Sequence, residues 1–597
     1  MKVNESLKSY QDIKLIETKS GHLSAELDGC LLHSRYDPVK EAKKFAEKNY
    51  KKNHLHILFG LGLGYQAKEL LNLMGESDAL FIIEPNAEVF ETAKKNGFLK
   101  RFLGDKRMGI YIEKARSESG EALKDLDKVL MGWLRLYPNR TAFSCLPNYD
   151  KLYPDVLKIL KKKIKDTTKK LLIDVNTMHF FALKWQKNFV QNLYTSLIKA
   201  KPFKGLVGRF SCPIVITSGG PSLIKQLDLL RKVKNKCIVL CAGSTIGSLL
   251  KHDVKPHCVV TVDGSGVNYT HFKDINIDNV LMIYELMLHH KIPEEHSGAQ
   301  AVFNFYKSRE GLIKKLQKRD LGTAFMGFSV ANTALSIAAQ LTSGPICVIG
   351  QDLAYTDNLS HADGNKGLKE INLDSVKDSK IYTFAKGYYG DEVLTDYAFL
   401  GMKDSFEKIV SYYKNVNQSR PIVNSTEGGL HIDGMDYMPF KEFVDKYCTQ
   451  DSTGEVRLLF EKPEFEPDVE HFYKQIKKYK NTLNKVIEIC ESAKKKHDRV
   501  KYELEIPNSI IKSLENIDKK LVKFLKDEFM KDVLEPVIFR VYNRYVEKEN
   551  ETPEEKTKRV LKKSKALYAE IKDAAEVTKE FVEELIKRVE RDLKERE

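Results

Sequence analysis

Six short apolar stretches alternate with helix-patterned segments between about residues 206 and 440. A strand this apolar is buried on both faces, which is typical of a parallel sheet covered by helices. Ligands of such sheets bind at the carboxyl ends of the strands. The sequence therefore predicts an α/β domain whose site lies where these stretches end. The stretches are PIVITS, CIVLCAG, CVVTVDG, VLMIYE, AVFNFY and ICVIGQDLAY.

The chain is longer than one domain. At 597 residues we expect about three domains. The segment HLHILFGLGLGYQAKELLNLMGESDALFIIE (54–84) has the order strand, glycine turn, helix and strand of a βαβ unit. After about residue 465, charged helical patterns are broken at Pro507, Pro536 and Pro553. The predicted class is α/β, with a Rossmann-like N-terminal domain (1–150), a helical connector (151–205), a central Rossmann-like domain with a parallel sheet (206–450) and a C-terminal α-helical bundle (465–597).

Composition argues against several classes of protein. Hydrophobic residues make up 42% and charged residues 30%, and no stretch approaches the ~20 apolar residues of a membrane helix. The opening segment lacks the features of a signal peptide, so we expect a cytoplasmic protein with no membrane partner. The net charge of +15 is diffuse and comes without a nucleic-acid-binding signature, so no nucleic-acid partner is expected. Nine scattered cysteines without zinc spacing predict reduced, structural thiols.

A glycine turn follows the first central strand, in IVITSGGPSL (214–223). Gly219 and Gly220 let the backbone approach a ligand closely, and Pro221 suits the first position of a helix. Ser222 adds a hydroxyl group beside the free N–H groups of the helix start, which favour an anion such as phosphate, and Ser218 is a further candidate nucleotide- or sugar-binding residue of this turn. No Gly-Lys-Ser/Thr follows, so a Walker-type ATPase or kinase is disfavoured.

Polar residues also follow the other central strands. An α/β enzyme carries its catalytic and binding residues on such loops. The stretch ICVIGQDLAYTDNLSHADG (346–364) is the richest of them in polar residues. Asp263, just beyond an apolar run, either contacts sugar hydroxyls or caps the following turn. The segment FMGFSVANTALSIAAQL (325–341) predicts a helix suited to close approach to the sheet. The candidate site residues at these ends are Asp263, Ser329, Gln351, Asp352, Tyr355, His361, Asn424 and Glu427.

The N-terminal turn GLGLG (60–64) has two interpretations. With Glu84 at the end of the next strand, it resembles the first half of a Rossmann or methyltransferase fold, in which an acid binds ribose hydroxyls. Glycines at this spacing also mark close packing of a helix on a sheet. We favour the packing interpretation, because the pattern alone is weak.

The central motifs resemble the motility-associated factor (Maf) family of flagellin nonulosonic-acid glycosyltransferases. The resemblance covers roughly residues 50–440 and rests on SGGPSL, the Asp263 strand end, GFSVANTAL, GQDLAYTDNLSHA and NSTEGG, with WQKNFVQN (185–192) ahead of them. The central domain of this family also appears in an archaeal pterin pyrophosphokinase. It is similar in turn to the bacterial CMP-sialic acid sialyltransferases, which implies a sialyltransferase-like (GT-A-like) fold.

The resemblance implies transfer of a nonulosonic acid, of the pseudaminic or legionaminic type, from its CMP donor to Ser or Thr hydroxyls of flagellin. This reaction serves flagellum assembly and motility. The loop from Ser218 to Ser222 would hold the CMP phosphate and ribose, and the C-terminal helices would grip flagellin. The loop reads Ser218-Gly219 where the sialyltransferases have Gly-Asn, which puts their asparagine contact to the nucleotide in doubt here.

The transfer chemistry needs a base for the attacking hydroxyl and a means of stabilising the departing phosphate. His361 is the favoured base, because imidazole titrates near neutral pH. Asp352 is the competing base, the residue that orients the base, or a contact to a substrate hydroxyl. Tyr388 and Tyr389 correspond by position to the paired tyrosines that contact phosphate in sialyltransferases. The loop on which an Asp-x-Asp pair would be expected to hold a divalent ion has no such pair, so neither a metal nor a cofactor is expected.

Three alternatives stay open. The GLGLG turn with Glu84 is compatible with an S-adenosylmethionine-dependent methyltransferase, although no Asn/Asp-Pro-Pro-Tyr-like strand end follows. A flagellin-binding chaperone or export factor would need no catalysis, but the full set of polar strand ends argues against it. A pterin pyrophosphokinase suits the long flanking domains less well than an enzyme with a protein acceptor does.

Overall fold

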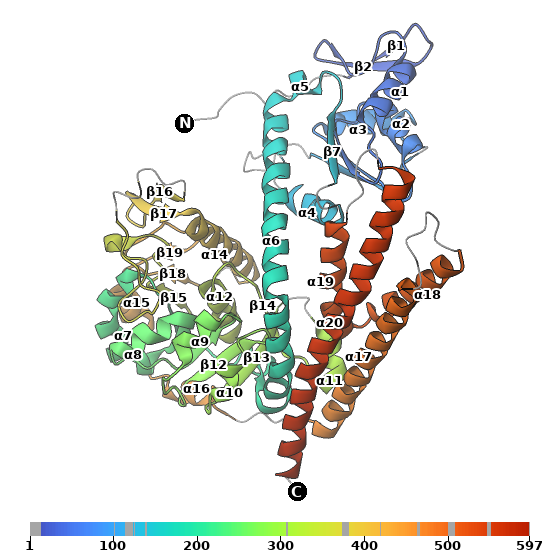
Figure 1. Cartoon of the computed structure of the whole chain (residues 1–597). Coiled ribbons are helices and arrows are strands. Elements are labelled where there is room, and N and C mark those ends of the chain that lie inside the picture. Colours follow the sequence, from blue (N-terminus) through green and yellow to red (C-terminus); the bar gives the residue numbers. More distant parts are fainter. Residues whose placement is uncertain are drawn as a thin grey trace. The chain divides into compact units, whose positions relative to one another are not determined.

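A computed structural model describes residues 13–100, 102–113, 123, 126–137, 140–305, 309–372, 376, 381–417, 420–461, 466–498, 508–545 and 551–595. The chain divides into two compact units, Met1–Phe180 and Phe181–Glu597, and the division falls within the long helix α6 (Pro154–Tyr194) (Figure 1). Each unit is described by itself below.

The first unit contains the predicted βαβ arrangement. Four parallel strands follow the order β6-β5-β4-β7, and a separate antiparallel sheet has the order β1-β2-β3. Every residue of β4 and β5 is buried, which explains why these strands are continuously apolar. The strands are β1 (Lys14–Glu17), β2 (Leu23–Leu27), β3 (Cys30–Leu31), β4 (Leu55–Phe59), β5 (Ala79–Glu84), β6 (Met108–Ile112) and β7 (Thr141–Cys145), and the helices are α1 (Pro38–Asn49), α2 (Tyr65–Leu73), α3 (Ala87–Lys95), α4 (Leu126–Leu136) and α5 (Tyr149–Leu152).

The second unit is built on the parallel sheet that the apolar runs predict. Its ten strands follow the order β14-β13-β12-β11-β10-β9-β15-β18-β19, with β8 paired to β13. The chain runs outward from β9 to β14 and then returns to the other side of β9 as β15. The strands are β8 (Lys201–Pro202), β9 (Ile214–Thr217), β10 (Ile238–Ala242), β11 (Cys258–Thr261), β12 (Leu281–Glu285), β13 (Gln300–Phe305), β14 (Thr323–Ala324), β15 (Ile346–Ile349), β18 (Ile422–Asn424) and β19 (Asp436–Tyr437).

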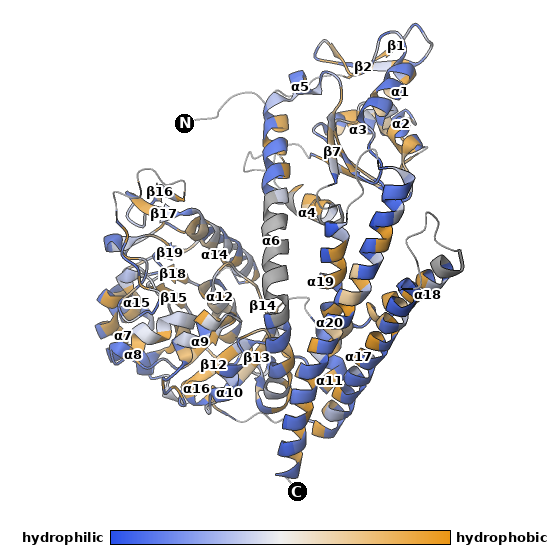
Figure 2. Ribbon diagram, viewed as in Figure 1, coloured by the Kyte–Doolittle hydropathy of each residue, from blue (hydrophilic) through white to orange (hydrophobic). Residues whose placement is uncertain are grey.

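Helices cover both faces of this sheet. Alternate residues of β9 enter different cores: Ile214 and Ile216 join the core that contains α12 (Val330–Leu341) and α14 (Tyr397–Val416), while Val215 joins the other. Figure 2 shows hydrophobic colouring along these strands. An antiparallel hairpin, β16 (Tyr382–Lys386) and β17 (Glu392–Asp396), precedes α14.

The C-terminal helices share the second of these cores. Buried residues of α17, α19 and α20 belong to the same hydrophobic cluster as Val215 of the sheet. The break expected at Pro536 is wrong, because α19 continues through this residue. Val533 and Val537 on either side are buried, and this packing offsets the hydrogen bond that proline removes. Pro553 begins α20 as expected, whereas Pro507 lies outside the described residues. The helices are α17 (Val469–His497), α18 (Asn508–Phe524), α19 (Glu528–Arg544) and α20 (Pro553–Lys594).

Two expectations from composition can be compared with the structure. All nine cysteines are free thiols, as predicted, and seven of them are buried. Among the described residues, no helix is long and apolar enough to cross a membrane.

Candidate functional site

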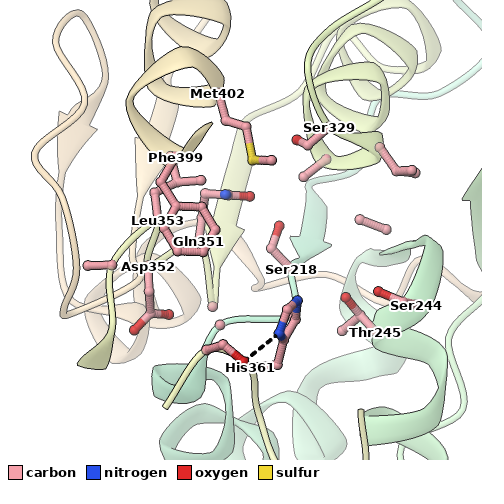
Figure 3. A pocket seen from close by; sticks show the side chains of 18 residues that line it. Ser218, Ser244, Thr245, Ser329, Gln351, Asp352, Leu353, His361, Phe399 and Met402 are labelled. Carbon is pink, nitrogen blue, oxygen red and sulfur yellow. Dashed lines mark hydrogen bonds between the residues drawn. The ribbon is translucent and has the colours of Figure 1, made fainter. Parts of the chain in front are cut away.

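The candidate site lies at the carboxyl ends of β9 and β15, where the strand order reverses. A doubly wound sheet binds its ligand at such a switch point. A cavity of about 190 Å³ opens there, bordered by the ends of these strands, the residues after β10, and the first turns of α12 and α14. Figure 3 shows the side chains that line it. Seven of the predicted site residues are among them: Ser218, Gly219, Gly220, Ser329, Gln351, Asp352 and His361.

The glycine turn packs tightly against the next strand of the site. The N–H of Gly220 donates to the carbonyl of Gly350 over 2.7 Å, and a Cβ at Gly220 would lie 2.0 Å from Asp352 Oδ1. Pro221 takes the first position of a helix, as predicted, but this helix is a 3₁₀ helix, η3 (Pro221–Gln226), ahead of α7 (Leu227–Val233). The close approach that the glycines permit therefore brings the turn against other residues of the protein, where a ligand had been expected.

Asp352 ties the glycine turn to the loop after β15. Its Oδ1 accepts a hydrogen bond from the Ser222 hydroxyl over 2.7 Å, and its Oδ2 accepts from the Thr356 hydroxyl over 2.6 Å and from the Ser222 N–H over 3.3 Å. Burial raises the pKa of the Asp352 carboxyl above its ordinary value. Because both oxygens are engaged, this geometry favours a positioning role for Asp352. It also means that the Ser222 N–H, expected to face phosphate, faces a carboxylate.

His361 lies over the glycine turn. A Cβ at Gly219 would be 3.7 Å from His361 Cδ2, and the imidazole Nδ1 lies 3.0 Å from the Ser360 hydroxyl oxygen, the contact drawn in Figure 3. The Ser360 hydroxyl also donates to the Gly367 carbonyl over 3.4 Å, so it accepts from His361 Nδ1–H. Burial lowers the pKa of His361 below its ordinary value. The imidazole is therefore neutral at pH 7 with an unprotonated Nε2, which is the form a general base requires.

Two buried polar atoms of the cavity lining have no hydrogen-bond partner among the described residues. They are Ser218 Oγ and Gln351 Oε1, on side chains that are 2% and 5% exposed. The Gln351 N–H donates to Thr426 Oγ1 over 3.1 Å, which fixes the backbone of the strand end. An unpaired buried polar atom costs about 1–3 kcal/mol, and such groups in native proteins usually mark bound water or a ligand.

Two predicted residues cap helices or turns. Asp263 accepts hydrogen bonds from the Ser265 N–H and hydroxyl, each over 2.8 Å, so its carboxylate caps the turn before α9 (Gly266–Phe272). Ser329 is the N-cap of α12 and shares a capping box with Asn332, yet it also lines the cavity. The sugar contact predicted for Asp263 stays a prediction, while the capping interpretation agrees with its hydrogen bonds.

The other predicted residues lie beside the cavity lining. The Tyr355 hydroxyl donates to Asp396 over 2.6 Å. Asn424 is fully buried, and its Oδ1 accepts from the Thr426 N–H over 3.0 Å. Glu427 has a positive φ of 55° and accepts from the Phe440 N–H over 2.9 Å. These three residues support the strand ends and the hairpin.

The paired tyrosines of the hairpin do not line the cavity. Tyr388 donates to the Asn424 carbonyl over 3.2 Å, and Tyr389 is 71% exposed. Sequence reasoning also missed two lining residues, Ser244 and Thr245, which follow β10 in the segment CAGSTIGSLL (241–250). The signal that would have found them is the end of β10, because ligands of parallel sheets bind at the carboxyl ends of the strands.

The GLGLG turn of the first unit is filled by the protein's own side chains. A Cβ at Gly60 would lie 2.6 Å from the Tyr149 ring, at Gly62 2.5 Å from His33 Nε2, and at Gly64 2.8 Å from Phe102. The packing interpretation of these glycines is therefore confirmed.

The backbone and acid of this turn are also engaged internally. The Leu61 N–H donates to Glu84 over 2.7 Å, and the Gly62 N–H donates to the Tyr149 hydroxyl over 3.1 Å. The Leu63 N–H donates to His33 Nε2 over 2.7 Å. Glu84 is fully buried, and burial raises its pKa to about 7. It accepts from the Tyr149 hydroxyl over 2.8 Å, so the acid expected to bind ribose instead binds this turn.

Comparisons with known proteins bear on the fold. Residues 187–358 match the profile of a family described as 6-hydroxymethylpterin diphosphokinase MptE-like. The solved structure of a Maf glycosyltransferase from Magnetospirillum magneticum AMB-1 aligns with 97% of this chain and 91% of its own, with a TM-score of 0.60 and 14% sequence identity. The chain shares the fold of this Maf glycosyltransferase. The predicted α/β class with parallel sheets and a helical C-terminal region is thus confirmed, and no curated protein matches in sequence.

The shared fold and the family match describe the surroundings of the cavity and do not assign its chemistry. The MptE-like match begins at the WQKNFVQN segment and ends after Asp352 and Thr356, so it includes the glycine turn and the strand end that borders it. In the part of the chain that the structure describes, no three His, Cys, Asp or Glu side chains gather in a way that could hold a metal ion.

Proposed function

We propose that this chain is a glycosyltransferase whose donor occupies the cavity at β9 and β15. The observation that carries the proposal is the pair of unpartnered buried atoms, Ser218 Oγ and Gln351 Oε1, facing a cavity that His361 also lines. A hydroxyl and an amide carbonyl suit the hydroxyls and amide-like edges of a nucleotide sugar. The shared fold with a Maf glycosyltransferase supports this assignment.

In the proposed reaction, His361 Nε2 takes the proton of the attacking hydroxyl while the nucleotide departs. Ser360 holds the opposite nitrogen and thereby fixes the tautomer, as a base needs. Asp352 positions the glycine turn through Ser222 and the loop through Thr356. In this proposal the glycosidic bond forms and the bond to the leaving phosphate breaks within one cavity.

The finer proposal is that the donor is a CMP-activated nonulosonic acid and the acceptor a Ser or Thr hydroxyl of flagellin. It rests on the resemblance of the SGGPSL, GQDLAYTDNLSHA and NSTEGG motifs to the Maf family. These motifs place Ser218, Asp352 and His361 around the cavity, which supports a common ligand for them. No metal or cofactor is proposed to take part.

A second candidate is transfer of diphosphate to a pterin. The observation that favours it is the match of residues 187–358 to the MptE-like profile. We place it second, because none of the described residues that line the cavity is a Lys or Arg that could receive a triphosphate. Methyl transfer at the GLGLG turn is disfavoured, since Tyr149, His33 and Phe102 occupy the space beside its glycines.

Titration calorimetry with CMP tests the donor assignment. We expect CMP to bind the purified protein, and UDP, ATP and S-adenosylmethionine to bind at least tenfold more weakly, with no change when EDTA is added. Ser218→Ala should weaken CMP binding by about three- to tenfold, because a hydrogen bond to the ligand is lost. Ser265→Ala, which affects a turn outside the cavity, is the matched control. Tight ATP binding without CMP binding would favour the pterin candidate, and binding of S-adenosylmethionine alone would overturn the cavity assignment.

A further inference from the structure

Asn365 lies where the loop that carries His361 meets two other elements of the site. Its side chain is 5% exposed, although its neighbour Lys366 is exposed. A Cβ at Gly219 would lie 3.2 Å from Asn365 Nδ2, and this nitrogen lies 3.4 Å from both the carbonyl oxygen and the hydroxyl oxygen of Ser244. A buried amide, at a position that the sequence does not single out, therefore contacts the glycine turn and the end of β10.

A chain of hydrogen bonds connects His361 to this amide. The His361 Nδ1–H donates to the Ser360 hydroxyl oxygen over 3.0 Å (Figure 3), and the Ser360 hydroxyl donates to the Gly367 carbonyl over 3.4 Å. The Gly367 N–H donates to Asn365 Oδ1 over 2.8 Å. Because a backbone N–H can only donate, the Asn365 atom at this end of the chain is the oxygen.

The backbone of Gly367 lies between the amide and the imidazole. A Cβ at Gly367 would lie 3.2 Å from Asn365 Oδ1, and 3.7 Å and 3.8 Å from His361 Cε1 and Nδ1. Ser360 Oγ also accepts from the Lys369 N–H over 2.8 Å, so its hydroxyl proton is directed to the Gly367 carbonyl. By holding Gly367, Asn365 keeps Ser360 oriented to accept from the imidazole.

The charge of the residue at position 365 matters for a base. Burial lowers the pKa of His361, and the cationic forms of His271 and Lys369 lower it further. The Gly367 backbone opposes part of this shift of the pKa. A carboxylate in place of Asn365 would favour the imidazolium ion and raise the pKa again. The neutral amide orients the ring without adding charge, so Nε2 stays unprotonated at neutral pH.

We propose that Asn365 is a positioning residue for His361. Through Gly367 and Ser360 it holds the imidazole in the tautomer that carries its proton on Nδ1, which leaves Nε2 for the cavity that His361 lines. The benefit to catalysis rests on the proposed function, because Nε2 takes up a proton only if this chain transfers a sugar to a hydroxyl. The tautomer and the orientation of the ring do not depend on that reaction.

The tautomer of His361 can be measured by NMR on the full-length protein labelled with [¹⁵N]histidine. Long-range ¹H–¹⁵N correlations distinguish the two ring nitrogens, and the signal lost in His361→Asn is that of His361. We expect the wild type to carry its proton on Nδ1 alone and Asn365→Ala to exchange between both tautomers. Asp363→Asn is the matched control: it weakens the 2.7 Å ion pair of the same loop with Lys251 and should keep the wild-type tautomer.

Kinetics test the consequence for sugar transfer. Asn365→Ala should transfer the sugar about tenfold to a hundredfold more slowly, while the dissociation constant of CMP changes by less than about threefold. Asn365→Asp keeps an oxygen that accepts from the Gly367 N–H, so at about pH 8 its rate should return to within about threefold of the wild-type rate. Because its charge favours the imidazolium ion, the pH below which the rate decreases should be higher than in the wild type.

Two results would overturn the proposal. One is a folded Asn365→Ala protein with the wild-type tautomer and the wild-type rate. The other applies if Asn365→Ala does not fold, and is an Asn365→Asp protein whose pH profile matches that of the wild type. A wild-type protein that transfers no sugar, together with a changed tautomer in Asn365→Ala, would support the positioning role and contradict the proposed function.

Discussion

Replacing His361 by asparagine is expected to reduce the rate constant of sugar transfer by about 10²- to 10⁴-fold, the usual contribution of a general base. Binding of CMP should change by less than about threefold, because in the proposed reaction Nε2 acts on the attacking hydroxyl and not on the nucleotide. The reason lies in the geometry of the imidazole, which donates from Nδ1 to Ser360 and keeps Nε2 unprotonated. Single-turnover kinetics with saturating donor would measure the loss.

The rate of transfer should also depend on pH, because His361 acts as a base only when it is unprotonated. Burial lowers the pKa of His361 below the ordinary value, so the base form persists to lower pH than for a free histidine. Transfer should be independent of pH between about 7 and 8 and decrease tenfold per pH unit once the pH passes below that lowered pKa. His471→Asn, at a half-buried position in the first turn of α17 of the same unit, serves as the control. A full rate for His361→Asn would show that another group is the base.

Replacing Gly220 by alanine is expected to destabilise the second unit by about 1–3 kcal/mol and to abolish CMP binding. The new methyl group would lie 2.0 Å from Asp352 Oδ1 and 2.7 Å from the Gly350 carbonyl, so the glycine turn and the β15 strand end must separate. That movement breaks the contact of Asp352 with Ser222. Urea unfolding followed by fluorescence, with CMP calorimetry on the same sample, measures both effects.

Gly219→Ala is the matched control in the same turn. Its methyl group would meet Asn365 Nδ2 and Thr245 Oγ1 at 3.2 Å, where a shift of a few tenths of an ångström is enough. We expect a loss of less than about 1 kcal/mol in unfolding free energy and a folded, cooperative protein. If Gly220→Ala were as stable as Gly219→Ala and still bound CMP, the tight packing of Asp352 against the turn would not be what shapes the site.

Much of the second unit can be predicted from the sequence, because its strands are buried on both faces. A run such as ICVI, with no polar residue, has few other places in a soluble fold, and the observed β15 spans Ile346–Ile349. The same reasoning placed Gln351 and Asp352 at the cavity, since the polar residues begin where the strand ends. Periodicity and strand ends thus carry information about the site.

Long-range contacts could not be predicted in the same way. Ser222 and Asp352 are 130 positions apart, and nothing in either motif says that one binds the other. Pro536 shows that packing can also override a local preference. Proline predicts a break in the helix, but the helix stays intact with buried residues on either side. Likewise, the GLGLG turn has the spacing of a nucleotide site, and only the structure reveals that the Tyr149 ring packs against its first glycine.

Sugar transfer itself is the most direct test of the proposed function. Flagellin would be incubated with the purified protein and a CMP-activated nonulosonic acid, and its Ser- and Thr-containing peptides analysed by mass spectrometry. The proposal predicts peptides heavier by one nonulosonic acid residue, release of one CMP per sugar attached, and neither product with His361→Asn. Intact CMP binding without any modified peptide, under conditions in which the donor remains unhydrolysed, would contradict it.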